Sequence, residues 1–331
     1  MIYFICPDFS DPSGGTRAIY FQVQLLCEAG LPARVVHTAP GFKLTWHGID
    51  APTTAISQLT HLSSSDVWVV PEGHLQLLSL FPDAPGRRIL NVLNWFILPS
   101  VLPTRDDLAR GGVVAAISPS RYIKSYFEWA YGIPCSYLPA SINPAKFFDA
   151  PKLAGSVNIA YMSRKTDFGH MVRNAVIAKR GGRENVNFFA MGTLSEDEYA
   201  FNLHNAHIYL ATGTAEGLNI SVLEAMACGA LIIGFDGAGG QDYMRGSGPG
   251  QNCILVEGGD FLQFAKSTDE AIDQLLANPM GYMDVLSNAR STASQYADVG
   301  RERDELVGFF KRFLALYTPG EQTQQPKSQS T

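Results

Sequence analysis

The chain has 331 residues, a length that favours two domains of ordinary size, and 46% of them are apolar, enough to bury a full core. Its formal net charge of −6 gives no support for binding nucleic acid through its phosphates. No apolar run approaches the length of a membrane span, and Pro7 and Asp8 interrupt the N-terminal MIYFIC, which therefore predicts a strand and not a signal peptide. The five cysteines are scattered without a C-x-x-C pair, which argues against disulfides and zinc and favours a reducing cytoplasm.

Short apolar strands alternate with helices along the first half, a pattern typical of parallel sheets built from βαβ units. A Gly-Gly loop after the first strand leads into a helix expected from Thr16 to about Gly30. Ser118 and Pro119 open a further helix, SRYIKSYFEWAYG, whose few basic residues allow at most a peripheral membrane association. The predicted strands of this half cover residues 2–6, 33–37, 66–71, 88–93 and 112–118.

A stretch rich in proline and small residues, 136–156, lacks a clear period and predicts the linker between two domains. The alternation then restarts, and residues 298–317 show helical periodicity with charges on one face. The polar tail after Pro319 is expected to be disordered. The predicted strands of the second half cover residues 157–162, 186–191, 206–211, 230–235 and 253–256. We expect two doubly wound α/β domains whose strand carboxyl ends share a ligand-binding cleft.

One stretch, AEGLNISVLEAMACGALIIGF (215–235), carries two glutamates eight positions apart. Ser221 and Glu224 form S-x-x-E, so one hypothesis is a capping box in which Glu224 satisfies a backbone N–H group. The helix that follows is small and apolar all round, and therefore buried. Its N-terminus at the carboxyl edge of a parallel sheet favours a phosphate, whereas Glu216 and Glu224 favour hydroxyl groups. A nucleotide sugar offers both.

The E-x7-E pattern followed by AMACG resembles the signature of the retaining GT-B glycosyltransferases of family 4, the glycosyl transferases group 1. The flanks HNAHIYLATGTAEG and ALIIGFDGAGGQDY agree with that family, as do AISPSRYIKSYF and YLPASINPAKF, so the likeness extends over most of the chain. It implies a GT-B fold of two facing Rossmann-like domains. The two domains would be an acceptor-side domain (1–145) and a nucleotide-sugar domain (146–300). A C-terminal helix (301–317) that packs back on the first domain and the tail (318–331) would follow them.

The resemblance also assigns residues to the donor site. Glu216 would hold hydroxyls of the transferred sugar, and Glu224 those of the ribose. Arg164, after the strand 157–162, would neutralise the leaving diphosphate. The family's glycine before this arginine is Ser163 here, and its lysine five positions after the arginine is Gly169, so Lys165 is the substitute candidate. The alternative for Arg164 and Lys165 is a solvated basic pair. The remaining donor-binding candidates, most of them expected to act through the backbone, are Gly14, Gly15, Gly192, Gly217, Leu218, Asn219 and Ile220.

The N-terminal half offers further candidates. Glycines at 14 and 15 allow the backbone to approach a ligand closely, although such a pair also makes ordinary turns. Many family members place a histidine after a strand of this domain, but this chain has Asn94 after the strand 88–93. His74, which follows another strand, is the alternative catalytic candidate, although a lone loop histidine is often structural. Trp95 and Phe96 fit either a sugar platform or the core.

The sequence therefore predicts a retaining hexosyl-type glycosyltransferase (EC 2.4) that uses a nucleotide-diphosphate sugar and a hydroxyl acceptor, whether glycan, lipid-linked or protein. No cofactor is expected, and no metal, because the chain has no D-x-D pair. The alternatives are a catalytically silent nucleotide-sugar-binding module, favoured by Asn94 in place of histidine, and a phage-type DNA glucosyltransferase, which the acidic balance opposes. A dehydrogenase lacks its G-x-G-x-x-G fingerprint.

Overall fold

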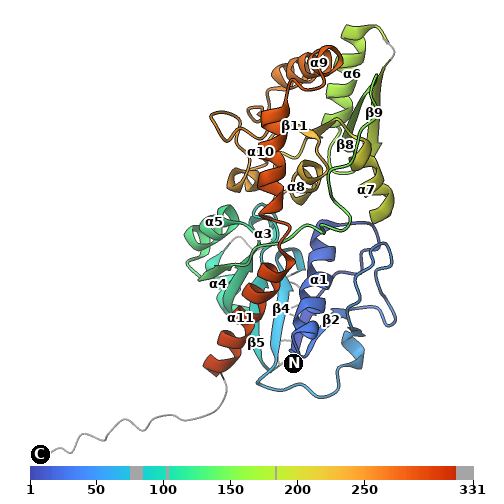
Figure 1. The fold of residues 1–331 in the computed structure, drawn as a ribbon. Coiled ribbons are helices and arrows are strands. Elements are labelled where there is room, and N and C mark those ends of the chain that lie inside the picture. Colours follow the sequence, from blue (N-terminus) through green and yellow to red (C-terminus); the bar gives the residue numbers. More distant parts are fainter. Residues whose placement is uncertain (75–84, 102–103, 183–184, 318–331) are drawn as a thin grey trace, which may run out of the picture.

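Two parallel β-sheets organise the protein in a computed structural model, which describes residues 1–74, 85–101, 104–182 and 185–317 (Figure 1). The first sheet and its helices form the lower part of Figure 1, and the second sheet with its helices forms the upper part. We call these the N-terminal and C-terminal units. The prediction of an α/β fold with two parallel sheets is confirmed. The tail predicted to be disordered lies outside the described residues.

The N-terminal sheet has the described strand order β3-β2-β1-β4-β5-β6-β7, and every pairing is parallel. Its strands are β1 (Ile2–Ile5), β2 (Ala33–His37), β3 (Thr53–Ala55), β4 (Val67–Pro71), β5 (Arg87–Asn91), β6 (Val113–Ser118) and β7 (Cys135–Tyr137). Its helices are α1 (Gly14–Glu28), η1 (Ile56–Gln58), η2 (Glu72–His74), α3 (Ile97–Val101), α4 (Arg105–Arg110) and α5 (Arg121–Tyr131). Successive strand side chains enter opposite cores: Phe4 packs on the face covered by α1, and Ile5 on the face covered by α4 and α5.

The C-terminal sheet has the described order β12-β11-β10-β8-β9, again parallel throughout. Its strands are β8 (Val157–Met162), β9 (Val186–Met191), β10 (Ile208–Ala211), β11 (Leu231–Gly234) and β12 (Ile254–Leu255). Its helices are α6 (Phe168–Arg180), α7 (Glu196–Asn205), α8 (Ile220–Ala227), η3 (Gly239–Asp242), α9 (Phe261–Ala277) and α10 (Met283–Ser294). The order reverses between β1 and β4 in the first sheet, and between β8 and β10 in the second. Such switch points are where open parallel sheets bind ligands, at the strand carboxyl ends.

The last helix, α11 (Val299–Tyr317), returns to the N-terminal unit and runs beside α1 in Figure 1. Leu306, Phe310 and Phe313 are buried in the same core as Phe4, and the rings of Phe310 and Phe4 lie 5.8 Å apart. At its start, Glu302 accepts two hydrogen bonds from Ser141, from the backbone N and from Oγ, both at 2.6 Å. The helix therefore ties the linker to the N-terminal core.

Three local predictions are wrong. The helix α1 begins at Gly14 and not at Thr16, because extended Ser13 accepts the first helical bond from Arg17. The stretch predicted as linker begins inside β7. The strand β3 was not expected at all. Both strands have only three residues, too few to show an apolar alternation.

No helix within the described ranges is long and apolar enough to cross a membrane.

Truncating Phe310 tests the role of α11. Because its ring is fully buried, Phe310→Ala should lower the free energy of unfolding by about 3–5 kcal/mol. Leu316→Ala, on the exposed side of the same helix, should change it by less than about 0.5 kcal/mol. Chemical denaturation measures both, and equal effects would show that α11 does not belong to the N-terminal core.

Candidate functional site

The switch point of the C-terminal sheet gathers the charged candidates. Arg164 and Lys165 follow β8, and Glu216 lies in the loop after β10, so the carboxyl ends of these paired strands bring them together. Lys165 Nζ donates to both carboxylate oxygens of Glu216, at 2.7 and 2.6 Å. Lys165, the substitute candidate for the diphosphate, therefore forms an ion pair with Glu216 in this structure. Arg164 is exposed and has no ion-pair partner in the described part of the chain.

Glu216 is held firmly by its backbone. Its N–H donates to the Gly237 carbonyl at 2.8 Å, and it forms a β-bridge with Ala238, while only 8% of the residue is exposed. Ala238 has φ 69° and ψ −55°, a γ-turn conformation that is strained for a residue with a side chain. The surrounding structure therefore maintains a costly backbone shape directly beside the Glu216 carboxylate.

The helix α8 presents an uncapped N-terminus. It begins at Ile220 after Asn219, which has a left-handed backbone (φ 59°) and gives no side-chain cap. The predicted capping box is therefore wrong: Ser221 lies inside the helix, and its Oγ donates to Asn219 Oδ1 at 3.1 Å. The buried Nδ2 of Asn219 has no hydrogen-bond partner within the described ranges. Val222 N–H donates to the Asn219 carbonyl at 3.0 Å, whereas the backbone N–H groups of Ile220 and Ser221 have no acceptor there. These N–H groups and the unpaired amide donor at one place favour an anion.

Glu224 lies in the second turn of α8 and accepts a hydrogen bond from the Tyr199 hydroxyl at 2.9 Å. Burial raises the pKa of this carboxyl to about 7, although Arg17 and the Tyr199 hydroxyl oppose the shift. Its Oε1 has no partner in the described structure. Oε1 can therefore accept a hydrogen bond from a ligand hydroxyl while Tyr199 holds Oε2.

The N-terminal unit brings a second helix N-terminus to the same place. A Cβ atom built on Gly14 would lie 3.9 Å from the Ile220 side chain, and one on Gly15 would lie 3.6 Å from Leu93. Both glycines belong to the first turn of α1, with no side-chain cap from Ser13. The first turns of α1 and α8 thus meet where the two units contact each other, a region around Gly14, Gly217 and Ile220 that we call the seam. Two positive dipole ends at one point suit a ligand with more than one negative charge.

The loop after β5 closes this seam. A Cβ atom on Gly217 would lie 1.8 Å from the Leu93 carbonyl oxygen, and one on Gly239 equally close to the Gly217 carbonyl oxygen. Asn94 follows directly; it is half-buried, and its Oδ1 accepts a bond from Phe96 N at 3.4 Å. On the other side, Leu93 N donates to buried Glu72, and burial raises the pKa of Glu72 to about 7.

The other candidates are more widely spread. Leu218 packs its side chain into the C-terminal core, so only its backbone is available. Gly192 follows β9, and a Cβ atom added to it would lie 3.7 Å from Ser163 Oγ. His74 ends η2 and lines a separate pocket in the N-terminal unit, where burial lowers its pKa. Trp95 contacts Tyr122 and Tyr126 with its ring, so it packs within the N-terminal unit.

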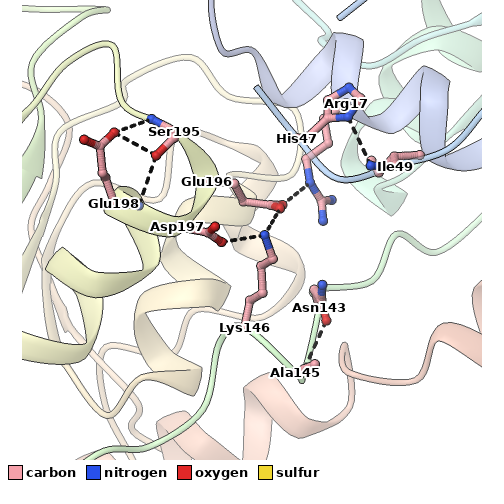
Figure 2. A network of polar contacts seen from close by, with 10 residues as sticks. All are labelled: Arg17, His47, Ile49, Asn143, Ala145, Lys146, Ser195, Glu196, Asp197 and Glu198. Atoms are coloured by element: carbon pink, nitrogen blue, oxygen red, sulfur yellow. Dashed lines mark hydrogen bonds and ion pairs between the residues drawn. The ribbon is translucent and has the colours of Figure 1, made fainter. Parts of the chain in front are cut away.

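A charge network around the buried carboxylate of Glu196, which the sequence did not predict, crosses the seam (Figure 2). Glu196, the first residue of α7, accepts from Arg17 Nε at 2.8 Å and from Lys146 Nζ at 2.6 Å. Lys146 also binds Asp197 at 2.8 Å. Burial would raise the pKa of Glu196, but Arg17 and Lys146 outweigh it and hold the pKa below its usual value. The network joins α1, the linker and α7.

Several glycosyltransferases are among the known proteins that this chain resembles. Residues 169–278, within the C-terminal unit, match the family described as glycosyl transferases group 1. The chain is 26% identical over 195 residues to an alpha-1,6-glucosyltransferase of Actinobacillus pleuropneumoniae serotype 7 (strain AP76). That match covers 56% of this chain and 57% of the relative, so the chain spans little more than half of the curated protein it matches.

Solved structures support the fold over nearly the whole chain. Sucrose-phosphate synthase from Thermosynechococcus elongatus superposes with a TM-score of 0.70 at 14% identity, covering 95% of this chain and 99% of that one. A glycosyltransferase from Rickettsia africae ESF-5 gives 0.69 at 13% identity, with 96% and 99% covered. The pneumococcal O-GlcNAc transferase GtfA, solved with UDP and GlcNAc, gives 0.54 at 14% identity, with 78% and 58% covered. The fold is that of GT-B glycosyltransferases.

Replacing Gly217 tests the seam. The added Cβ atom of Gly217→Ala would overlap the Leu93 carbonyl, so the units must separate locally, and we expect a loss of about 1–3 kcal/mol in the free energy of unfolding. Gly250→Ala is the matched control, because nothing lies within 4 Å of its Cβ position. Thermal or denaturant unfolding of both variants decides the point; a Gly217→Ala protein as stable as the control would contradict the close backbone contact.

Proposed function

We propose that this protein is a glycosyltransferase that moves a sugar from a nucleoside-diphosphate sugar to an acceptor hydroxyl. The observation that carries the proposal is the meeting of the N-termini of α1 and α8, one from each unit and neither with a side-chain cap. The carboxylates Glu216 and Glu224 belong to the same site, as does Arg164, which has no ion-pair partner among the described residues. This set offers donors for a diphosphate and acceptors for sugar hydroxyls within one seam. The relation to group 1 glycosyltransferases supports the same conclusion.

The diphosphate would lie between the two helix ends, where N–H groups of Gly217 to Ile220 and the guanidinium of Arg164 stabilise charge as the leaving group departs. Such preorganised donors are the largest contribution to many enzymatic rate enhancements. Glu224 would accept hydrogen bonds from the ribose hydroxyls. The glucosyltransferase and GtfA relatives, named for glucose and GlcNAc transfer, favour a hexose as the transferred sugar.

Glu216 would hold the transferred sugar. In the free protein Lys165 neutralises this buried carboxylate, which limits the cost of burying it. With the donor bound, Lys165 would lie between Glu216 and the diphosphate, since its side chain is 54% exposed and free to turn. We propose transfer with retention, in which the acceptor hydroxyl attacks on the face that the diphosphate leaves and a phosphate oxygen takes its proton.

A binding module without catalysis is the second candidate, because Asn94 and not a histidine lies beside Gly217 at the seam. Asn94 can orient a hydroxyl but cannot titrate near neutral pH. Release of free sugar from a nucleotide sugar separates the two candidates, since a binding module releases none. We also propose a reducing compartment such as the cytoplasm, because the five cysteines are scattered without a C-x-x-C pair.

Neutralising Glu216 should impair transfer far more than folding. Glu216→Gln loses a charge-assisted hydrogen bond to the sugar, about 1.5–3 kcal/mol, or roughly 10- to 150-fold in kcat/KM. Steady-state kinetics with the nucleotide sugar measures the loss, and exposed Glu270→Gln serves as the control. Unchanged turnover in Glu216→Gln would remove Glu216 from the sugar site.

Removing Arg164 should weaken binding of a nucleoside diphosphate much more than binding of the nucleoside. A lost charge-assisted bond to phosphate predicts about a tenfold or greater rise in Kd for the diphosphate. Titration calorimetry of Arg164→Ala with both ligands gives the comparison. Equal losses for the two ligands would indicate a structural defect and not lost phosphate recognition.

Transfer should also proceed in the presence of a chelator. The proposal assigns the diphosphate charge to Arg164, Lys165 and the helix N-termini, so added EDTA should leave the rate within about twofold. Activity that EDTA abolishes and manganese or magnesium restores would replace this electrostatic account with a metal-assisted one.

A further inference from the structure

A second concave site lies at the switch point of the N-terminal sheet. It is a pocket of about 300 Å³ at the carboxyl ends of β1 and β2, with His74 of η2 on its far side. Ile5 and Val36 form part of its lining, and the loop that begins at Pro7 forms a rim. Ligands bind open parallel sheets where the strand order reverses, and here that is between β1 and β4.

The pocket contains a fixed negative charge. The carboxylate of Asp8 accepts bonds from the backbone N–H groups of Thr38 and Ala39, at 3.2 and 2.7 Å, from the Thr38 hydroxyl and from His37 Nδ1 at 3.0 Å. Burial alone would raise its pKa, but these bonds hold the pKa below its usual value. His37 does not supply a full positive charge, since burial lowers its own pKa. Asp8 is therefore an anion at neutral pH.

Nothing in the described lining balances that charge. The described residues around the pocket include no lysine or arginine, and burial also lowers the pKa of His74. The imidazole of His74 has no hydrogen-bond partner in the described structure. A phosphate monoester carries nearly two negative charges at neutral pH and would be repelled here.

The remaining lining is apolar with polar edges. Phe9, 47% exposed, and Ile56 present apolar surface, whereas Thr38 and His74 present groups that can donate or accept. Apolar walls with a few fixed polar groups are typical of small-molecule pockets. A sugar ring has C–H faces and hydroxyl edges that match this arrangement.

Two short segments of the chain run from the pocket to the seam. The helix η2 has His74 at the pocket and Glu72 at its other end, where the carboxylate accepts from Leu93 N at 3.1 Å. The same Leu93 carries its carbonyl against Gly217. The loop from Pro7 leads to Gly14, the start of α1 at the seam.

We propose that this pocket receives the acceptor, and that the acceptor group it takes is an uncharged sugar and not a phosphorylated one. This inference rests on the proposed transferase function. The hydroxyl that attacks the donor would extend from the ring held between Phe9, Ile56 and His74 towards the seam.

Saturation-transfer NMR on the full chain tests the proposal with methyl α-glucoside, methyl β-galactoside and glucose 6-phosphate as probes. At least one uncharged glycoside should bind at least tenfold more tightly than glucose 6-phosphate. Ile56→Trp, which fills the pocket, should weaken glycoside binding at least fivefold. Ser57→Trp is the matched control, since this exposed neighbour in η1 adds the same bulk outside the lining.

A second variant keeps the proposal testable if Ile56→Trp does not fold. Thr38→Lys places a cation beside Asp8 and should improve glucose 6-phosphate binding at least tenfold relative to the glycosides. Equal glycoside binding in Ile56→Trp and Ser57→Trp, tighter binding of glucose 6-phosphate to the wild type, or no response in Thr38→Lys would overturn the proposal. Calorimetry with UDP on the same proteins distinguishes failure of the acceptor-pocket proposal from failure of the proposed transferase function. If the wild-type protein binds neither UDP nor another nucleoside diphosphate, the transferase function itself is contradicted.

Discussion

The contact between the Gly217 backbone and the Leu93 carbonyl sets the distance between the two units, because any side chain at position 217 would overlap that oxygen. At this spacing a Cβ atom added to Gly14, in the first turn of α1, would lie 3.9 Å from the side chain of Ile220, the first residue of α8. Each helix alone offers a weak anion site, since dipole effects fall off within one turn. The seam places the two ends together, and the proposed diphosphate site depends on that juxtaposition.

Ion pairs at the seam neutralise its buried carboxylates, while two cationic side chains there remain exposed to a ligand. Glu196 is neutralised by Arg17 and Lys146, so a buried carboxylate connects the units at an acceptable cost (Figure 2). Lys165 does the same for Glu216, but from a side chain that remains half-exposed. Arg164 has no such partner in the described chain, which leaves its charge available to a ligand. The strained Ala238 beside Glu216 is maintained by the same packing, as expected where a site is preorganised.

The sequence predicted the parts that depend on local apolar pattern. The strand 157–162 is β8 with the same bounds, and the helical periodicity of 298–317 corresponds to the helix α11. Spacing alone also singled out Glu216 and Glu224 as a pair near a helix start. The start itself was misplaced, because a left-handed Asn219 ends the loop without any capping side chain, a backbone choice that residue type does not dictate.

Long-range pairings could not be predicted from the chain. Arg17 and Glu196 are 179 positions apart, and Lys165 and Glu216 are 51 apart, so only the folded topology brings them into contact. The pocket beside Asp8 has the same origin, since its lining comes from separate strand ends and two short helices. The strands β3 and β7 were not predicted either, because three residues are too few to show an alternation of apolar and polar side chains.

Amide hydrogen exchange with and without a nucleoside diphosphate tests the central claim most directly, because it reports each helix end separately. If the two N-termini form one site, saturating UDP or another nucleoside diphosphate should slow exchange at residues 14–17 and 217–221 together. Slowing confined to residues 217–221, with the first turn of α1 unchanged, would contradict a diphosphate site shared by the two units.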